Sequence, residues 1–78
     1  RIGMIVGHTQ FNDRQRARLA GARQALEEAG LSLPDTLVVE QSLTLAGGRA
    51  GCAMLLDLED RPTALIGGID VFAIGCLE

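Results

Sequence analysis

Three short apolar runs divide this chain of 78 residues, and each is followed by a segment with helical features. Apolar runs of this length are too short for core helices and are typical of strands covered on both faces. The runs are residues 2–6, 36–40 and 64–66, and the helices are expected over residues 12–29, 44–56 and from 70 onwards. Strands that alternate with helices pair in parallel through right-handed crossovers. The sequence therefore predicts an α/β fold, a three-layer parallel sheet with strand order 2-1-3.

Polar residues and glycine mark the ends of the expected helices. Asn12 or Asp13 is expected to cap the first helix, because a short polar side chain accepts amide hydrogen bonds there. For the same reason Thr44 is expected to cap the second helix and Asp70 the third. Gly30 is expected to end the first helix, since glycine is common just beyond helix ends.

The composition limits the classes of function open to the chain. Its content of 47% hydrophobic and 22% charged residues is that of a globular domain, and its formal net charge is −3. A DNA-contacting surface should be basic, so this segment is not expected to touch DNA itself. The seven cationic residues are all arginine, which excludes mechanisms that need a lysine, such as a Schiff base or a P-loop.

No catalytic or metal-binding motif is found in the sequence. It lacks GxSxG, GxGxxG, Walker and HExxH patterns, and the single histidine, His8, has no acidic or cysteine cluster at metal-ligand spacing. A phospho-accepting receiver domain would need acidic residues where this chain has Gly7-His8 and Gly67-Gly68. We therefore expect no catalysis, no metal and no cofactor.

The two cysteines, Cys52 and Cys76, lie in apolar helical patterns without a CxxC motif. This placement predicts buried free thiols and favours a reducing, cytoplasmic location. No apolar run approaches the roughly 20 residues of a membrane span, so no membrane partner is expected.

Three loops should carry any ligand site, because ligands of such sheets bind beyond the carboxyl ends of the strands. These loops are residues 7–13, 41–44 and 67–70. The first leads into a basic helix start in which Arg14 and Arg18 are four residues apart and share a face. Arginines oppose the macrodipole at a helix N-terminus, so they predict either a solvated basic face or a guanidinium site for a polar or anionic ligand.

Four stretches resemble the effector-binding core of LacI/GalR-type bacterial transcription regulators. They are residues 18–21 (RLAG), 39–43 (VEQSL), 61–64 (RPTA) and 67–70 (GGID). The resemblance implies a periplasmic-binding-protein-like fold, in which residues 1–78 are a fragment of the C-terminal subdomain. It also implies a cytoplasmic, homodimeric regulator that binds operator DNA through a helix-turn-helix domain outside this chain. The alternatives are a periplasmic sugar- or solute-binding protein of an ABC transporter and a fragment of a doubly wound enzyme.

The resemblance also implies roles for individual residues. The arginine of RLAG reaches the bound effector in that family, which implies this role for Arg18, and the positions of Asn12 and Arg14 face the pocket in several members. Leu43 stands where the family has a stacking aromatic residue. Ile69 stands where it has an asparagine that hydrogen-bonds the effector.

These two replacements make the expected pocket more apolar while its cation remains. Neutral sugars would leave hydroxyl groups unpaired there, whereas Arg18, joined by Arg14 and His8, could hold a small polar or anionic effector. Our hypothesis at this point is a small carboxylate or phosphorylated metabolite.

Overall fold

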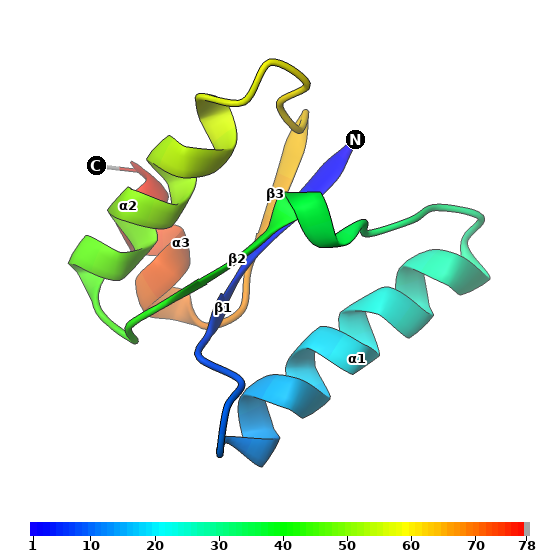
Figure 1. The fold of residues 1–78 in the computed structure, drawn as a ribbon, viewed down its shortest axis with the longest axis horizontal. Coiled ribbons are helices and arrows are strands. Elements are labelled where there is room, and N and C mark those ends of the chain that lie inside the picture. Colours follow the sequence, from blue (N-terminus) through cyan, green and yellow to red (C-terminus); the bar gives the residue numbers. More distant parts are fainter. Residues whose placement is uncertain (78) are drawn as a thin grey trace.

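The computed structural model describes residues 1–77, and its elements alternate as the apolar runs predicted (Figure 1). They are β1 (Ile2–Gly7), α1 (Asp13–Glu28), the 3₁₀ turn η1 (Asp35–Leu37), β2 (Val38–Gln41), α2 (Leu45–Leu56), β3 (Ala64–Gly67) and α3 (Asp70–Leu77). The strands form one parallel sheet in the order β2-β1-β3, which confirms the predicted topology. Helix α1 covers one face of this sheet, and α2 and α3 cover the other.

The face under α2 and α3 holds the larger core cluster. It contains buried side chains from β1, η1, α2 and α3, namely Ile5, Leu37, Cys52, Leu55 and Phe72. The two helices approach each other closely at glycines: a Cβ on Gly48 would lie 2.6 Å from the Phe72 carbonyl oxygen, and one on Gly75 would lie 2.4 Å from the Leu45 carbonyl oxygen. Only glycine permits this backbone-to-backbone contact.

The face under α1 is packed through side chains. Met4, Val6 and Leu33 are buried there, and half-buried residues of α1 cover them, including Leu19 and Leu26. These α1 residues recur at helical spacing, as the sequence predicted. The helix ends where expected: Gly30 has a φ of 78°, and the Leu31 amide donates to the Leu26 carbonyl at 2.8 Å, as in a Schellman motif.

Several predicted boundaries are wrong by one or two residues: each strand ends one residue later than expected, and β2 and α3 do not begin as expected. Residues 36 and 37 belong to a 3₁₀ turn, because the Leu37 amide donates to the Pro34 carbonyl at 2.9 Å, and β2 begins only at Val38. Asp70 is the first residue of α3, since the Ile69 carbonyl accepts the amides of Phe72 and Ala73 and thus occupies the cap position. A carboxylate in the first turn still interacts favourably with the helix dipole.

Candidate ligand site at the carboxyl edge of the sheet

The loops that follow the three strands meet at one edge of the sheet, which is the lower edge in Figure 1. The parallel register brings them together, because Gly7 at the end of β1 pairs with Gln41 at the end of β2, and Ile5 pairs with Gly67 of β3. The β1–α1, β2–α2 and β3–α3 loops therefore form one surface. This is the edge at which we expected a ligand site from the sequence.

A pocket of about 450 Å³ opens at this edge, between the first helix and the start of the third. Its walls come from α1 and from the β3–α3 turn, and it is lined by Arg18, Gly68, Ile69, Asp70 and Val71. The structure thus brings together Arg18 and Ile69, two of the residues that the resemblance proposed. Its volume lies within the range of small-molecule sites.

The arginines of α1 divide into engaged and free side chains. Arg16 forms an ion pair with Asp13 and donates to the Thr9 carbonyl oxygen at 2.8 Å, and Arg23 forms an ion pair with Asp35. Across residues 1–77, Arg14 and Arg18 have neither a hydrogen-bond nor an ion-pair partner. These are the two arginines for which the sequence predicted either a ligand site or a solvated basic face.

A larger hollow of about 590 Å³ runs along the opposite side of α1. Its cationic lining residues, Arg16 and Arg23, are already paired with Asp13 and Asp35. It also lies away from the β3–α3 turn. The pocket at Arg18 is therefore the better candidate, although it is smaller.

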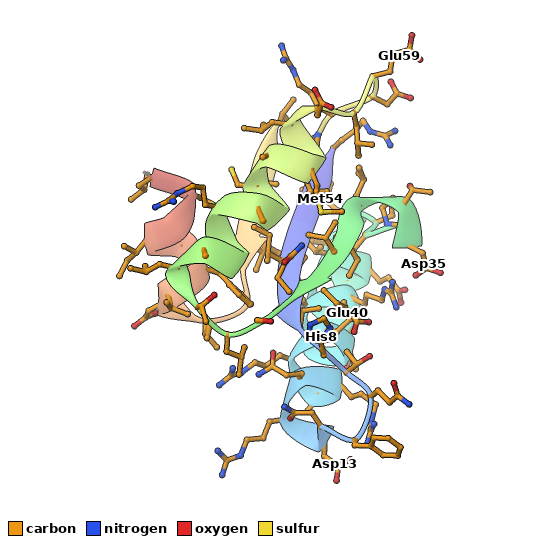
Figure 2. All side chains as sticks on the ribbon, turned by 60° about the vertical axis from the view of Figure 1, so that its left-hand side comes forward. His8, Asp13, Asp35, Glu40, Met54 and Glu59 are labelled. Atoms are coloured by element: carbon orange, nitrogen blue, oxygen red, sulfur yellow. The ribbon has the colours of Figure 1, made fainter. Side chains whose placement is uncertain are left out.

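Glu40 fastens the β1–α1 loop to the end of β2. Its Oε1 accepts the Thr9 amide at 2.9 Å, and its Oε2 accepts the Thr9 hydroxyl at 3.0 Å. His8 lies beside it, with 3.8 Å between His8 Nδ1 and Glu40 Oε1 (Figure 2). The His8 side chain is 63% exposed and turned toward Glu40, so it lies beside the contact between Glu40 and Thr9 that holds this loop.

Gln15 fastens the other end of the same loop. Its side chain is 3% exposed, and its Oε1 accepts the Gly7 amide at 2.9 Å. The Asn12 side chain accepts the Gln15 amide at 3.3 Å, which confirms Asn12 as the helix cap. Since this side-chain oxygen is engaged in capping, a direct ligand contact by Asn12 remains an expectation.

Leu43 lies over the end of the first strand. A Cβ on Gly7 would meet the Leu43 Cδ2 at 2.6 Å and the Gln15 Cδ at 2.8 Å, so these two side chains cover Gly7 closely. Leu43 is 48% exposed and presents an apolar surface at the edge where the ligand is expected. Thr44 caps α2 as predicted, with its Oγ1 accepting the Gly47 amide at 2.9 Å.

Cys52 and Cys76 are free thiols, as predicted, with Cys52 buried and Cys76 half-buried. Burial is the larger cause, and the neighbouring Cys52 the smaller cause, of a pKa of the Cys76 thiol raised to about 11.

Among residues 1–77 no three His, Cys, Asp or Glu side chains are grouped to hold a metal ion. Over the same residues, no helix has the length and apolar character needed to cross a membrane.

The sequence did not identify the residues that hold the β1–α1 loop, namely Gln15, Glu40 and Thr9. One signal was available: Asn12 and Gln15 have the spacing of a capping box, which predicts a side chain that reaches back across the helix start. Gln15 does reach back, but to Gly7 in the strand. The pairing of Glu40 with Thr9 depends on strand register, which the sequence specifies only through the fold.

Comparison with known proteins agrees with this geometry. The chain is 34% identical over 76 residues to the HTH-type transcriptional repressor PurR of Klebsiella pneumoniae and 36% identical to that of Salmonella paratyphi B, with 97% of the chain aligned in each case. It spans 22% of the length of these curated relatives. No protein-family model matches the chain.

Solved structures show the same fold. A sugar-binding transcriptional regulator of the LacI family from Escherichia coli, complexed with phosphate, superposes with a TM-score of 0.83 at 32% identity, with 97% of this chain and 27% of that one covered. A LacI-family transcriptional regulator from Mycobacterium smegmatis gives a TM-score of 0.87 at 28% identity, with 99% and 29% covered. The fold is therefore that of a periplasmic-binding-protein-like core. Sequence and fold together place the chain in the LacI/GalR family of transcription regulators.

Proposed function

We propose that this chain is an effector-sensing part of a LacI-type transcription regulator and binds a small molecule without catalysis. The observation that carries the proposal is the unpaired Arg18 guanidinium in a pocket at the carboxyl edge of the sheet. An unpaired arginine in a pocket offers a planar fork of donors to a polar or anionic ligand. The similar proteins described above are transcriptional repressors and regulators, which supports regulation over solute transport or catalysis.

The position of the pocket suggests how binding could be transmitted. Arg18 belongs to α1 on one face of the sheet, and Ile69 to Val71 lead into α3 on the other face. A ligand in contact with both would bind best to the state in which these elements are closest. It would thereby shift the population between two states of the regulator.

The remaining parts of the proposal concern the whole protein. We place operator-DNA binding in a helix-turn-helix domain outside this chain, because the net charge of −3 does not suit a DNA-contacting surface. We also propose a homodimer that acts in the cytoplasm. The half-site spacing of its operator would then follow the two-fold symmetry.

The test uses the full-length protein that carries this chain and fluorescence anisotropy of labelled operator DNA. A panel of sugars, purines and small acids is screened for compounds that change the DNA affinity. For a compound that does so, Arg18→Ala should weaken its binding by about 2–5 kcal/mol, because the anionic or polar partner would lose its charged donor. DNA binding without the compound should be unchanged.

Arg61→Ala is the matched control, because Arg61 is an exposed arginine just before β3, at the opposite edge of the sheet. It should leave the compound's affinity unchanged. If no compound acts on DNA affinity, or if Arg18→Ala and Arg61→Ala behave alike, the proposed function or its site is wrong. A full-length protein that carries a signal peptide would instead favour the solute-binding alternative.

A further inference from the structure

The pocket at Arg18 combines a guanidinium group and the Asp70 carboxylate with two aliphatic side chains. Ile69 and Val71 supply aliphatic surface, Gly68 supplies backbone, and Arg18 supplies an unpaired guanidinium group. Leu43 adds a further exposed apolar side chain at the same edge, above Gly7. Such a lining matches a ligand with one charged end and an aliphatic body.

Several polar side chains of the surrounding loops are already engaged within the protein. Both carboxylate oxygens of Glu40 accept hydrogen bonds from Thr9, and the Gln15 carbonyl oxygen accepts the Gly7 amide. The oxygens of Asn12 and Thr44 cap helices α1 and α2. Among the residues that line the pocket, only Arg18 and Asp70 offer polar side chains to the hydroxyl groups of a neutral sugar. Each further buried hydroxyl without a partner weakens binding.

Asp70 limits the charge that the ligand can carry. It lines the same pocket as Arg18 but forms no ion pair with it, so its carboxylate adds a negative potential at the α3 side. One anionic group at Arg18 is favoured, while a second one at the far end of the ligand would be repelled by Asp70. Arg14 is also unpaired and lies one turn before Arg18, so it strengthens the attraction at the α1 side only.

We infer that the effector is a small monoanion with a branched or short aliphatic body, held by Arg18 through its carboxylate and covered by Ile69 and Val71. A carboxylate fits the guanidinium fork with two parallel hydrogen bonds, which a hydroxyl group cannot reproduce. This inference rests on the proposed function. It adds the chemical class of the ligand.

Calorimetry on the full-length protein tests the inference with three probes: isovalerate as the monoanion, glutarate as the dianion and glucose as the neutral polyol. Isovalerate should bind at least about tenfold more tightly than either of the others. Arg18→Ala should weaken isovalerate binding by at least about tenfold, Arg18→Lys by less, and Arg61→Ala not at all. Ile69→Asn should narrow the preference for isovalerate over glucose, because an amide offers both a donor and an acceptor to hydroxyl groups.

The outcomes separate this inference from the proposed function. If glucose binds more tightly than isovalerate and still changes operator affinity, the ligand class is wrong and the sensing function stands. If glutarate binds as well as isovalerate, the limit set by Asp70 is wrong. If isovalerate gives no saturable binding at millimolar concentrations, the inference fails, and the operator-DNA screen decides independently whether the sensing function fails with it.

Discussion

The two faces of the sheet are built in different ways. Under α2 and α3 the helices touch each other backbone to backbone at Gly48 and Gly75. Under α1 the sheet is covered by side chains such as Leu19 and Leu26. Gly21, in the middle of that helix, faces solvent, and a Cβ added to it would meet no atom within 4 Å. One face is thus held by close contact between helix backbones, and the other by side-chain packing, with the outer side of its helix open to solvent.

This difference matches what each face has to do. The close packing of α2 and α3 surrounds fully buried residues such as Leu55 and Phe72, so this face is expected to supply most of the stability. Helix α1 buries a narrow apolar stripe and points Arg14 and Arg18 away from it without partners. The face under α1 therefore carries the two arginines that we propose for ligand binding, and the face under α2 and α3 holds the sheet on which α1 packs.

The largest effect should come from adding a methyl group where α2 and α3 touch. In Gly48→Ala the new Cβ would lie 2.6 Å from the carbonyl oxygen and 2.7 Å from the Cα of Phe72. Because both are backbone atoms, α3 would have to move as a whole, and we expect a loss of about 3 kcal/mol in the free energy of unfolding. Urea unfolding followed by circular dichroism measures it. A loss below about 1 kcal/mol would mean that the α2–α3 contact adapts easily and that the contrast between the faces is overstated.

The second effect concerns the junction between the sheet and α1. Gln15→Leu removes the acceptor of the buried Gly7 amide, and an unsatisfied buried donor costs about 1–3 kcal/mol. Gln15→Glu keeps an oxygen acceptor at the same place and should lose less. Urea unfolding of both variants checks the prediction, and equal losses would show that packing rather than the hydrogen bond fixes this loop.

The sequence predicted the sheet better than it predicted the loop anchors. Strand order followed from the alternation of short apolar runs with helices, because few connections are compatible with a parallel sheet. The start of β2 was misplaced because Leu37 is apolar and fully buried whether it lies in a strand or in the observed turn. Apolar character reports burial, and it distinguishes poorly between a strand and a turn that leads into one.

The candidate site was predicted only in part, for a different reason. Arg18 and Ile69 could be chosen because each stands in a recognisable stretch after a helix start or a strand. The hydrogen bonds of Glu40 with Thr9 join residues 31 apart in sequence, and they depend on how the carboxyl ends of β1 and β2 align. Spacing along the chain carries no information on that alignment until the strand register is known.

The third effect is a pH dependence of stability that comes from Cys76 in α3. Burial and the neighbouring Cys52 raise the pKa of Cys76 from 9.0 to about 11, so the folded state keeps this thiol protonated longer than the unfolded chain does. As the pH rises from about 9 to 11 the unfolded state ionises first, and stability should fall by about 1–2 kcal/mol, allowing for the partial exposure of the thiol. Urea unfolding over this pH range should show the decline in the wild type and a smaller one in Cys76→Ala. Parallel pH profiles would show that the decline comes from other groups.

The smallest effect is a gain in the free energy of unfolding, and it concerns helix α1. Gly21→Ala adds the same methyl group as Gly48→Ala, again inside a helix, but into open space. Alanine also lowers the backbone entropy of the unfolded chain, so we expect a gain of about 0.5–1 kcal/mol in the free energy of unfolding. Urea unfolding of Gly21→Ala and Gly48→Ala measures both changes in the free energy of unfolding. Although the substitution is the same, we expect a gain at Gly21 and a loss at Gly48. If Gly21→Ala destabilised the chain, the exposed side of α1 that carries Gly21 would have to contact other atoms, and the room around Arg18 would have to be smaller as well.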